Sequence, residues 1–355
     1  MNIENLFTAK LIAANYTEAA GNADPYLGEG LFPAEKKMGL DLSWIKAYGG
    51  LPVSLAPSAF DAQATFRDRI AFDVIRSEMP FFREGVLLKE RDRQDMLRVQ
   101  SLDDPYANDI IARVFDDQKN LIDGARVVSE RMRMSLLFPE NGNLGININA
   151  NSVDYTYNYD QSGAWKSHNY FALSGTDLWT APTTADPLSQ LQALKAAVRA
   201  ITGEEPRYAA MNAYTFGLLK KTNAILTRVR NMSNTAVSFV SDREVRDVIF
   251  DALELEIVVY DRMFRDEAKN TRNFVPNGYV SVFPEGQLGK TVFGTTPEEA
   301  TLLGNAAADV AIVDTGIAIT IEHKPHPAQM ITYASEIVLP SYERMDSVGV
   351  MKVIA

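Results

Sequence analysis

The chain has 355 residues, of which 46% are hydrophobic and 23% charged, and its formal net charge is −11. This composition is that of a globular protein with a sizeable core, and the length allows one large domain or two to three smaller ones. The acidic balance argues against a protein that wraps nucleic acid, because phosphate contacts need Lys and Arg. The absence of cysteine excludes disulfide scaffolds, thiolate metal sites and thiol nucleophiles.

The N-terminal residues predict a short helix followed by an extended arm. Residues 1–15 lack the basic region of a signal peptide, and no stretch of the chain approaches about 18 uninterrupted apolar residues. We therefore expect no signal peptide, no membrane span and a protein that is intracellular when made. After the short helical pattern, AAGNADPYLGEGLFP is rich in Gly, Pro and Asn, a composition that interrupts regular structure.

Residues 38–100 predict strands and loops. Ile70, Phe72 and Val74 fall on one face, with Arg69, Asp73 and Arg76 near or on the other, as expected for a half-buried strand. The simplest interpretation is a long two-stranded excursion with Pro and Gly at its bends. Because a lone hairpin is marginal in water, such an excursion would need a partner surface if it projects.

Residues 104–138 carry the clearest helical pattern. Asp104 is a capping residue, Pro105 suits the first helical position, and Pro139 and Gly142 end the pattern. At 1.5 Å per residue this helix would be roughly 50 Å long. It is interpreted either as a core helix of a large domain or as a spine along an elongated molecule. The apolar positions recur at three- and four-residue steps: Ile111, Val114, Phe115, Leu121, Ile122, Ala125, Val128, Met132 and Leu136.

The rest of the chain predicts a strand pair, a compact mixed domain and closing strands. Residues 144–159 alternate and indicate two strands or one long bent strand. Residues 186–203 predict a helix with Asp186 as cap, Pro187 first and Gly203 at its end. Helices and strands then alternate to residue 320, with Asn212 as a cap and EIVVYDRMF as a buried strand, which indicates an α/β or α+β domain. The last 40 residues predict strands returning to a sheet.

One tripeptide resembles a phosphate-binding loop. FPEGQLGKTVFG contains Gly289-Lys290-Thr291, but Pro284 stands where such a loop needs its first glycine. Proline has no backbone N–H for a phosphate, and the residues after Thr291 predict a strand and a turn where a helix is required. The stretch is therefore interpreted as a turn between two short strands.

No other residue pattern predicts catalysis or metal binding. His168, His323 and His326 are the three histidines, and the prolines of HKPHP prevent the last two from sharing a helical face, so a solvent-exposed turn is expected there. No Gly-x-Ser-x-Gly elbow occurs. We expect no catalytic, cofactor-binding or metal-binding residues, hence no cofactor, and a protein that is not an enzyme. Structural roles as caps or solvated faces are expected for the acidic pairs: Asp103-Asp104, Asp116-Asp117 and Glu298-Glu299.

Two groups of arginines are interleaved with acids or apolar residues. This pattern indicates subunit contacts or salt bridges and does not indicate a basic surface that binds nucleic acid. The two groups are Arg91, Arg93 and Arg98, then Arg126, Arg131 and Arg133. An arm, a strand excursion and a very long helix are the parts of an assembly protein.

The chain resembles the lambda-like phage major capsid protein E family, whose members have the Hong Kong-type shell fold. The resemblance covers essentially the whole chain. It is carried by AMNAYTFGLLKKTNAIL, by FVPNGYVSVFPEGQLGKTVFGTTPEEA and by EHKPHPAQMITYASEIVLPSYERMDSVGVMKV, in which LPSYERMDSVGVMKV is the most telling piece. The order of arm, strand excursion and long helix also matches.

The resemblance implies an α+β fold in five parts. These are an N-terminal arm (1–37), an extended β-hairpin loop (38–90), a peripheral domain with a spine helix (91–185, helix 104–138), an α/β axial domain (186–320) and C-terminal strands that return to the peripheral domain (321–355).

The resemblance also implies a structural protein of the virion, assembled in the host cytoplasm. It would form hexamers and pentamers of an icosahedral shell that encloses DNA without sequence-specific binding and without a membrane. Expected partners are other copies of the chain, a scaffolding protein, a portal and a decoration protein. The alternatives are an encapsulating nanocompartment shell, a tail component, or a soluble oligomeric enzyme with an unmarked site.

Overall fold

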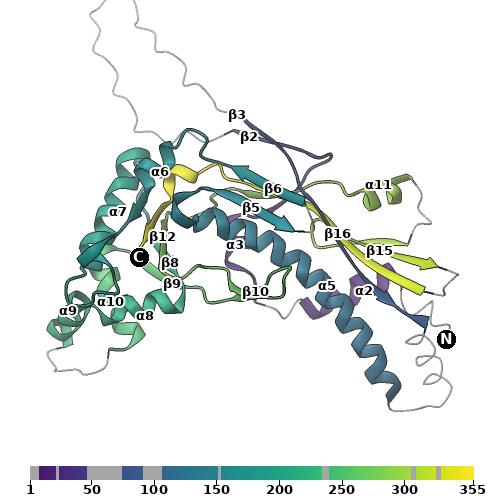
Figure 1. Cartoon of the computed structure of the whole chain (residues 1–355), viewed down its shortest axis with the longest axis horizontal. Coiled ribbons are helices and arrows are strands. Elements are labelled where there is room, and N and C mark those ends of the chain that lie inside the picture. The colour runs from purple at the N-terminus through teal and green to yellow at the C-terminus, as the bar shows by residue number, and fades with distance from the viewer. Residues whose placement is uncertain are drawn as a thin grey trace, which may run out of the picture. The chain divides into compact units, whose positions relative to one another are not determined.

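The computed structural model describes residues 8–20, 24–45, 74–90, 106–150, 153–233, 240–304, 309–324 and 329–355. Most of the predicted strand excursion (46–73), His326, Asp103, Asp104 and the basic residues Arg91, Arg93 and Arg98 lie outside these ranges. Helices and strands are mixed along the described chain, as an α+β fold requires (Figure 1). Among the described helices, none combines the length and hydropathy that crossing a bilayer requires.

The chain folds into two compact units, each made of three segments. Unit 1 consists of Met1–Ser43, Arg76–Arg133 and Gly289–Ser341, and unit 2 of Trp44–Ile75, Met134–Leu288 and Tyr342–Ala355. The predicted range 186–320 therefore contributes to both units, and the assignment of ranges to arm, loop, peripheral and axial domains stays a prediction.

Unit 1 is built around a six-stranded sheet whose longest strand is β16. This strand pairs antiparallel with β4, β15 and β13, while β14 pairs with β15 and β1 runs parallel to β13. Its strands are β1 Ala34–Lys36, β4 Phe81–Leu88, β13 Lys290–Phe293, β14 Val310–Val313, β15 Ile317–Lys324 and β16 Gln329–Ser341.

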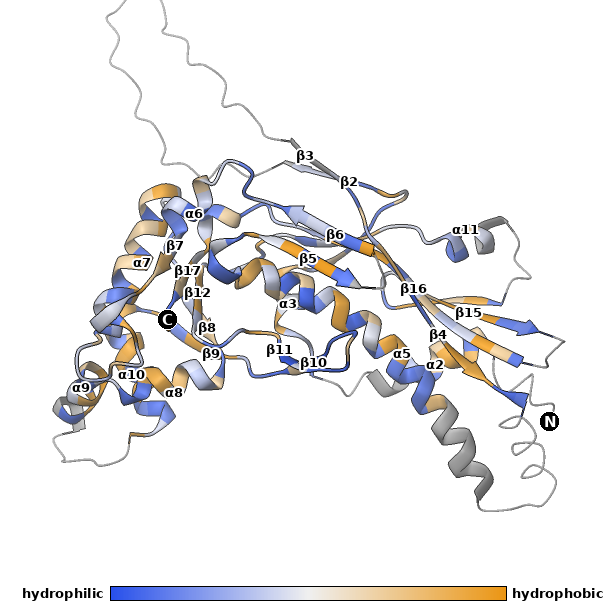
Figure 2. Cartoon of the chain, in the orientation of Figure 1, coloured by the Kyte–Doolittle hydropathy of each residue, from blue (hydrophilic) through white to orange (hydrophobic). Residues whose placement is uncertain are grey.

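Two helices cover one face of this sheet (Figure 1). They are α2 (Ala9–Ala20) and α5 (Tyr106–Leu137), so the predicted long helix is confirmed over residues 106–137, and residues 104 and 105 lie outside the described ranges. Leu121 and Ile122 of α5 are buried in one core with residues of α2, β14, β15 and β16. Hydrophobic and hydrophilic residues alternate along α5 (Figure 2), as its three- and four-residue spacing predicts. The remaining helices of unit 1 are α3 Leu27–Leu31 and α11 Pro297–Gly304.

The prediction that AAGNADPYLGEGLFP (residues 19–33) interrupts regular structure is wrong for part of this stretch. Residues 27–31 form α3, whose first turn is closed by the Tyr26 N–H donating to the Glu29 carboxylate at 3.3 Å. Residues 34–36 form β1 because β13 supplies a parallel partner. Composition alone identified the breaks at Gly and Pro, but a tertiary partner provides the hydrogen bonds that a lone short strand lacks.

Unit 2 contains a mixed five-stranded sheet with the order β7-β17-β12-β8-β9. Helices α7 to α10 pack with this sheet around one buried core. Its strands are β7 Tyr170–Ala172, β8 Tyr208–Met211, β9 Glu256–Val259, β12 Tyr279–Phe283 and β17 Gly349–Lys352, and its helices are α6 Ala164–Asn169, α7 Pro187–Thr202, α8 Ala213–Lys221, α9 Asn223–Ser233 and α10 Asp242–Leu253.

The predicted helix caps of unit 2 are confirmed. Asp186 accepts a hydrogen bond from the Ser189 N–H at the start of α7, and Gly203 ends the helix in the left-handed conformation. Asn212 accepts from the Thr215 N–H at the start of α8. Asp and Asn favour N-cap positions and Gly favours the left-handed position after a helix, so these ends could be predicted from the residue types alone.

In the part of the chain that the structure describes, three two-stranded sheets accompany the two larger ones. The predicted strand pair at 144–159 is confirmed as β5 (Gly145–Ala150) and β6 (Val153–Asn158), and β2 (Asp41–Ile45) pairs with β3 (Val74–Glu78). The third sheet is formed by β10 (Met263–Arg265) and β11 (Thr271–Asn273).

Three strand predictions need correction. EIVVYDRMF is not one buried strand: β9 ends at Val259, and the Ala213 N–H donates to the Asp261 carboxylate at 3.2 Å before β10 begins a separate hairpin. His323 is exposed as predicted, but it lies in β15, where β16 supplies its backbone partner, and not in a turn. The closing strands do not all return to one sheet, because β17 belongs to unit 2 whereas β15 and β16 belong to unit 1.

The stretch FPEGQLGKTVFG is a strand, a turn and a strand, as predicted. However, β12 and β13 do not pair with each other, because each belongs to a different sheet. Gly286 takes a left-handed φ of 96° in the turn, and the Lys290 Nζ forms an ion pair with Glu35 at 2.6 Å. Gly286 therefore shapes the turn, and the lysine of the tripeptide attaches the start of β13 to β1.

Gly289 is required by a close backbone approach in unit 1. A Cβ at this position would lie 2.1 Å from the Ser341 carbonyl oxygen. We expect Gly289→Ala to lower the free energy of unfolding by about 2 kcal/mol or more, since the backbone would have to move apart. Gly124→Ala is the matched control, because open space surrounds Gly124 on α5 and the replacement should stabilise by roughly 0.5–1 kcal/mol. Urea unfolding followed by circular dichroism measures both; equal effects would contradict this account.

Candidate functional site

The two histidines that the structure describes belong to different units. His168 is exposed on α6 in unit 2, and His323 belongs to unit 1. In the described ranges, no group of three or more His, Asp or Glu side chains is arranged to hold a metal ion. Glu298 and Glu299 lie in the first turn of α11, where acids complement the helix dipole.

A groove of about 770 Å³ lies in unit 2 along α7 and the end of α10. Its buried cation, Lys195, donates to the Leu253 carbonyl oxygen at 2.6 Å and lies 3.3 Å from the Glu205 carboxylate. Arg199 is also 3.7 Å from Glu205. Both cations of this groove are therefore paired with Glu205 within the chain.

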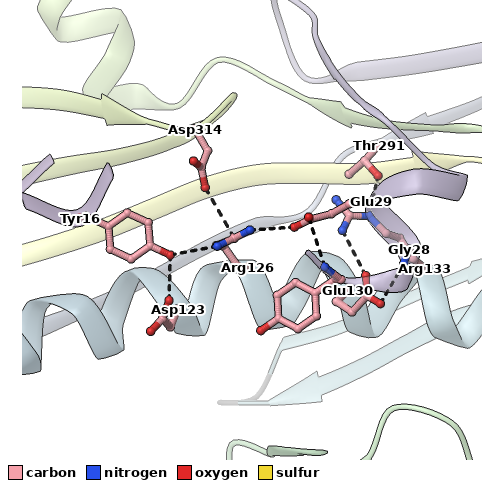
Figure 3. Close-up of polar contacts among 10 residues, drawn as sticks. Tyr16, Gly28, Glu29, Asp123, Arg126, Glu130, Arg133, Thr291 and Asp314 are labelled. Atoms are coloured by element: carbon pink, nitrogen blue, oxygen red, sulfur yellow. Dashed lines mark hydrogen bonds and ion pairs between the residues drawn. The ribbon is translucent and has the colours of Figure 1, made fainter. Parts of the chain in front are cut away.

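The most elaborate polar arrangement in the described chain lies along α5 in unit 1 (Figure 3). Its N-terminal half centres on Arg126, whose guanidinium contacts Glu29 at 2.9 Å and Asp314 at 3.6 Å. Arg126 also donates to the Tyr16 hydroxyl at 3.5 Å, and that hydroxyl donates to Asp123 at 2.8 Å. Burial raises the pKa of the Tyr16 phenol, so it stays a neutral donor.

The second half of this arrangement is fully buried. Arg133 forms an ion pair with Glu130 at 3.2 Å, and both side chains are almost completely removed from solvent. The other oxygen of Glu130 accepts from the Gly28 N–H at 3.1 Å. The Arg133 Nε donates to the Thr291 hydroxyl at 2.8 Å, and this hydroxyl donates to the Phe32 carbonyl oxygen at 2.8 Å.

This buried pair holds the segment of residues 24–36 onto α5 and β13. Gly28 lies so close that a Cβ there would be 2.4 Å from the Glu130 Oε2 and 2.6 Å from the Arg133 Cδ. Only glycine allows the backbone of α3 to approach at this distance. We call residues 24–36 the N-terminal segment, and Glu130 with Arg133 the anchor pair.

A second buried carboxyl group, that of Glu336 on β16, lies near the anchor pair. Its side chain is 1% exposed, and neither oxygen has a hydrogen bond of ordinary geometry. Burial raises the pKa of Glu336 to about 8; the Arg133 guanidinium and the nearby Ser129 hydroxyl oppose this shift but do not overcome it. Glu336 is therefore mostly neutral at pH 7.

Sequence reasoning found part of this arrangement. Arg126 and Arg133 were predicted as subunit contacts or salt bridges, and the structure shows salt bridges within the chain. Glu130 and Glu336 were missed. The spacing of Glu130 and Arg133 on a helix would have indicated a pair, whereas Glu336 in the apolar stretch ASEIVLP gave only the signal of a charge among buried residues.

Removing one member of the anchor pair should lower the free energy of unfolding strongly. We expect Arg133→Met to lower the free energy of unfolding by about 3–5 kcal/mol, because Glu130 would remain buried without its cation. The double variant Glu130→Gln/Arg133→Met should lose less than Arg133→Met alone, since no buried charge is left and the amide oxygen still accepts from Gly28. Chemical unfolding at pH 6 measures the free energy of unfolding of both variants and of the unmodified protein.

The matched control is Arg126→Met, which removes a partly exposed ion pair and should lower the free energy of unfolding by about 1 kcal/mol or less. If Arg126→Met and Arg133→Met had the same effect, burial would not be what makes the anchor pair important.

A search of protein families finds one whose profile spans this chain. The family is described as phage major capsid protein E, and its profile matches residues 8–353. No curated protein sequence matches the chain significantly.

Solved structures share the fold at low sequence identity. A prophage protein from E. coli CFT073 that is assigned as a capsid protein aligns over 98% of this chain and 99% of its own, with a TM-score of 0.62 and 12% identity. A phage-related protein from Bordetella bronchiseptica RB50 aligns over 96% of both chains, with a TM-score of 0.56 and 12% identity. The capsid protein of cyanophage A-1(L) aligns over 92% of both chains, with a TM-score of 0.53 and 12% identity.

Proposed function

Because this chain belongs to the phage major capsid protein E family, we propose that it builds its icosahedral head shell from hexamers and pentamers of one subunit type. The protein is a structural capsid subunit that assembles with copies of itself. The observation that carries the proposal is the family match over residues 8–353. This match favours a head shell over the tail component, the nanocompartment shell and the soluble enzyme considered above.

We propose roles for the parts of the subunit within this shell. Residues 1–37 act as an arm towards neighbouring subunits, and residues 38–90 act as the extended loop that reaches over an adjacent subunit. The α5 helix is the spine of the peripheral domain. Residues 186–320 act as the axial domain, which meets those of other copies at the centres of hexamers and pentamers. The length of α5 and the two separate cores support this division.

The proposed partners besides the chain itself are a scaffolding protein, a portal and a decoration protein, with assembly in the host cytoplasm. Packaged DNA is enclosed without sequence-specific binding. The net charge of −11 supports this, because an acidic inner wall repels phosphates and limits adhesion of the genome.

Assembly in solution tests this proposal. The full-length chain, expressed alone and with its scaffolding partner, should form closed shells in negative-stain electron microscopy, with five- and six-fold clusters in averaged images. A small defined oligomer under all of these conditions would refute the shell architecture.

The exposed aromatic residues of unit 2 allow a sharper prediction. Phe250 on α10 is 56% exposed and Tyr214 on α8 is 50% exposed in the single chain. If contacts between copies cover this part of unit 2, Phe250→Asp should leave the fold intact but reduce the yield of closed shells at least severalfold, because a charge would be buried at an interface core. Asp251→Asn, at the exposed neighbouring position, is the matched control and should assemble normally. Normal shells from Phe250→Asp would place the contacts elsewhere.

A further inference from the structure

We propose that the Glu336 carboxyl group is a proton-controlled switch that sets how tightly the N-terminal segment is held by the anchor pair. The proposal concerns the single chain and does not depend on how copies are arranged in a shell. It rests on three observations: an excess of buried acid, the double use of Arg133, and the position of Glu336 on β16.

The first observation is the charge balance of the buried site. Glu130, Arg133 and Glu336 are each less than 5% exposed, and they supply two carboxyl groups for one guanidinium. With Glu336 protonated, the Glu130 carboxylate and the Arg133 cation balance each other. With Glu336 ionised, a second carboxylate that is shielded from solvent shares the same cation, and such a group is costly to bury.

The second observation is that Arg133 serves two attachments at once. It fixes Glu130, which accepts from the Gly28 N–H, and it orients the Thr291 hydroxyl, which donates to the Phe32 carbonyl oxygen. Both attachments end on the N-terminal segment. A shift of the guanidinium towards an ionised Glu336 would therefore weaken both contacts together.

The third observation is what surrounds Glu336. On β16 it pairs with Phe82 of β4, and from α5 the Ser129 hydroxyl and the Arg133 guanidinium act on it. The charges at Arg83 and Glu298 belong to the opposite face of the strand, where Glu298 accepts from the Ser335 hydroxyl, because successive side chains of a strand alternate. Glu84 of β4 pairs with Ala334 and so shares the face of Glu336, but its side chain is exposed to solvent. Arg133, with its partner Glu130, is thus the buried charge to which a proton leaving Glu336 is coupled.

The direction of the effect follows from the raised pKa of Glu336. Its ordinary value of 4.5 applies to a solvated state, and the value of about 8 applies to the closed state. Between these values the closed state binds a proton that the open state releases to solvent, so a rise in pH favours opening. The N-terminal segment should be held fully below pH 4.5, be progressively loosened as pH rises towards 8, and change no further above that.

Hydrogen exchange of the full-length protein from pH 5.5 to 8.5 tests the switch. After correction for the intrinsic pH dependence of exchange, the opening equilibrium of peptides within residues 24–36 should increase with pH by up to about tenfold per unit and level off near pH 8. Glu336→Gln, which imitates the protonated form, should keep these peptides protected with no such slope.

Glu84→Gln is the matched control, because Glu84 is an exposed carboxylate on the neighbouring strand β4. It should retain the slope of the unmodified protein. A flat profile in the unmodified protein, or an equal slope in Glu336→Gln, would overturn the proposal.

Infrared spectroscopy of the unmodified protein keeps the test decisive if Glu336→Gln does not fold. A band of a protonated carboxyl group should be present at pH 6.5 and disappear as the pH rises through about 8. Absence of such a band at pH 6.5 would show that Glu336 is ionised in the folded protein and would overturn the switch.

Discussion

The ion pair between Glu130 and Arg133 is the contact on which the arrangement of unit 1 depends. It is buried on α5, and through Gly28 and Thr291 it ties the N-terminal segment and β13 to that helix. A buried ion pair contributes little net stability, since both ions lose their hydration. What the pair does in this structure is join three segments, because Glu130 accepts from Gly28 and Arg133 donates to Thr291, whose hydroxyl donates to the Phe32 carbonyl oxygen.

This dependence explains several features that otherwise look unrelated. Gly28 and Gly289 both permit backbone approaches that a Cβ would prevent. Thr291, the last residue of the tripeptide that resembles a phosphate loop, acts between Arg133 and the Phe32 carbonyl oxygen. The tripeptide therefore takes part in contacts within the subunit, and its threonine links α5 to the N-terminal segment.

Apolar spacing and capping residues predicted the elements that depend only on residues close together in the sequence. The spacing of apolar residues predicted α5 and α7, and Asp186, Asn212 and Gly203 marked helix ends because capping depends on neighbouring backbone groups. Local rules failed where a distant strand completes an element. Residues 34–36 become β1 because β13 lies beside them, and EIVVYDRMF divides because its two halves join different sheets.

The amino-acid sequence was sufficient for the fold class, the long helix, the family resemblance and the rejection of a phosphate loop, since each rests on periodicity, on backbone chemistry or on patterns read along the chain. It could not show that Glu130, Arg133 and Glu336 share one buried site. Residues 133 and 336 are separated by some 200 positions, and the charge balance of a site depends on which side chains the packing of α5 against β16 encloses together. Burial, and with it the raised pKa of Glu336, is a property of that enclosure and of no single segment.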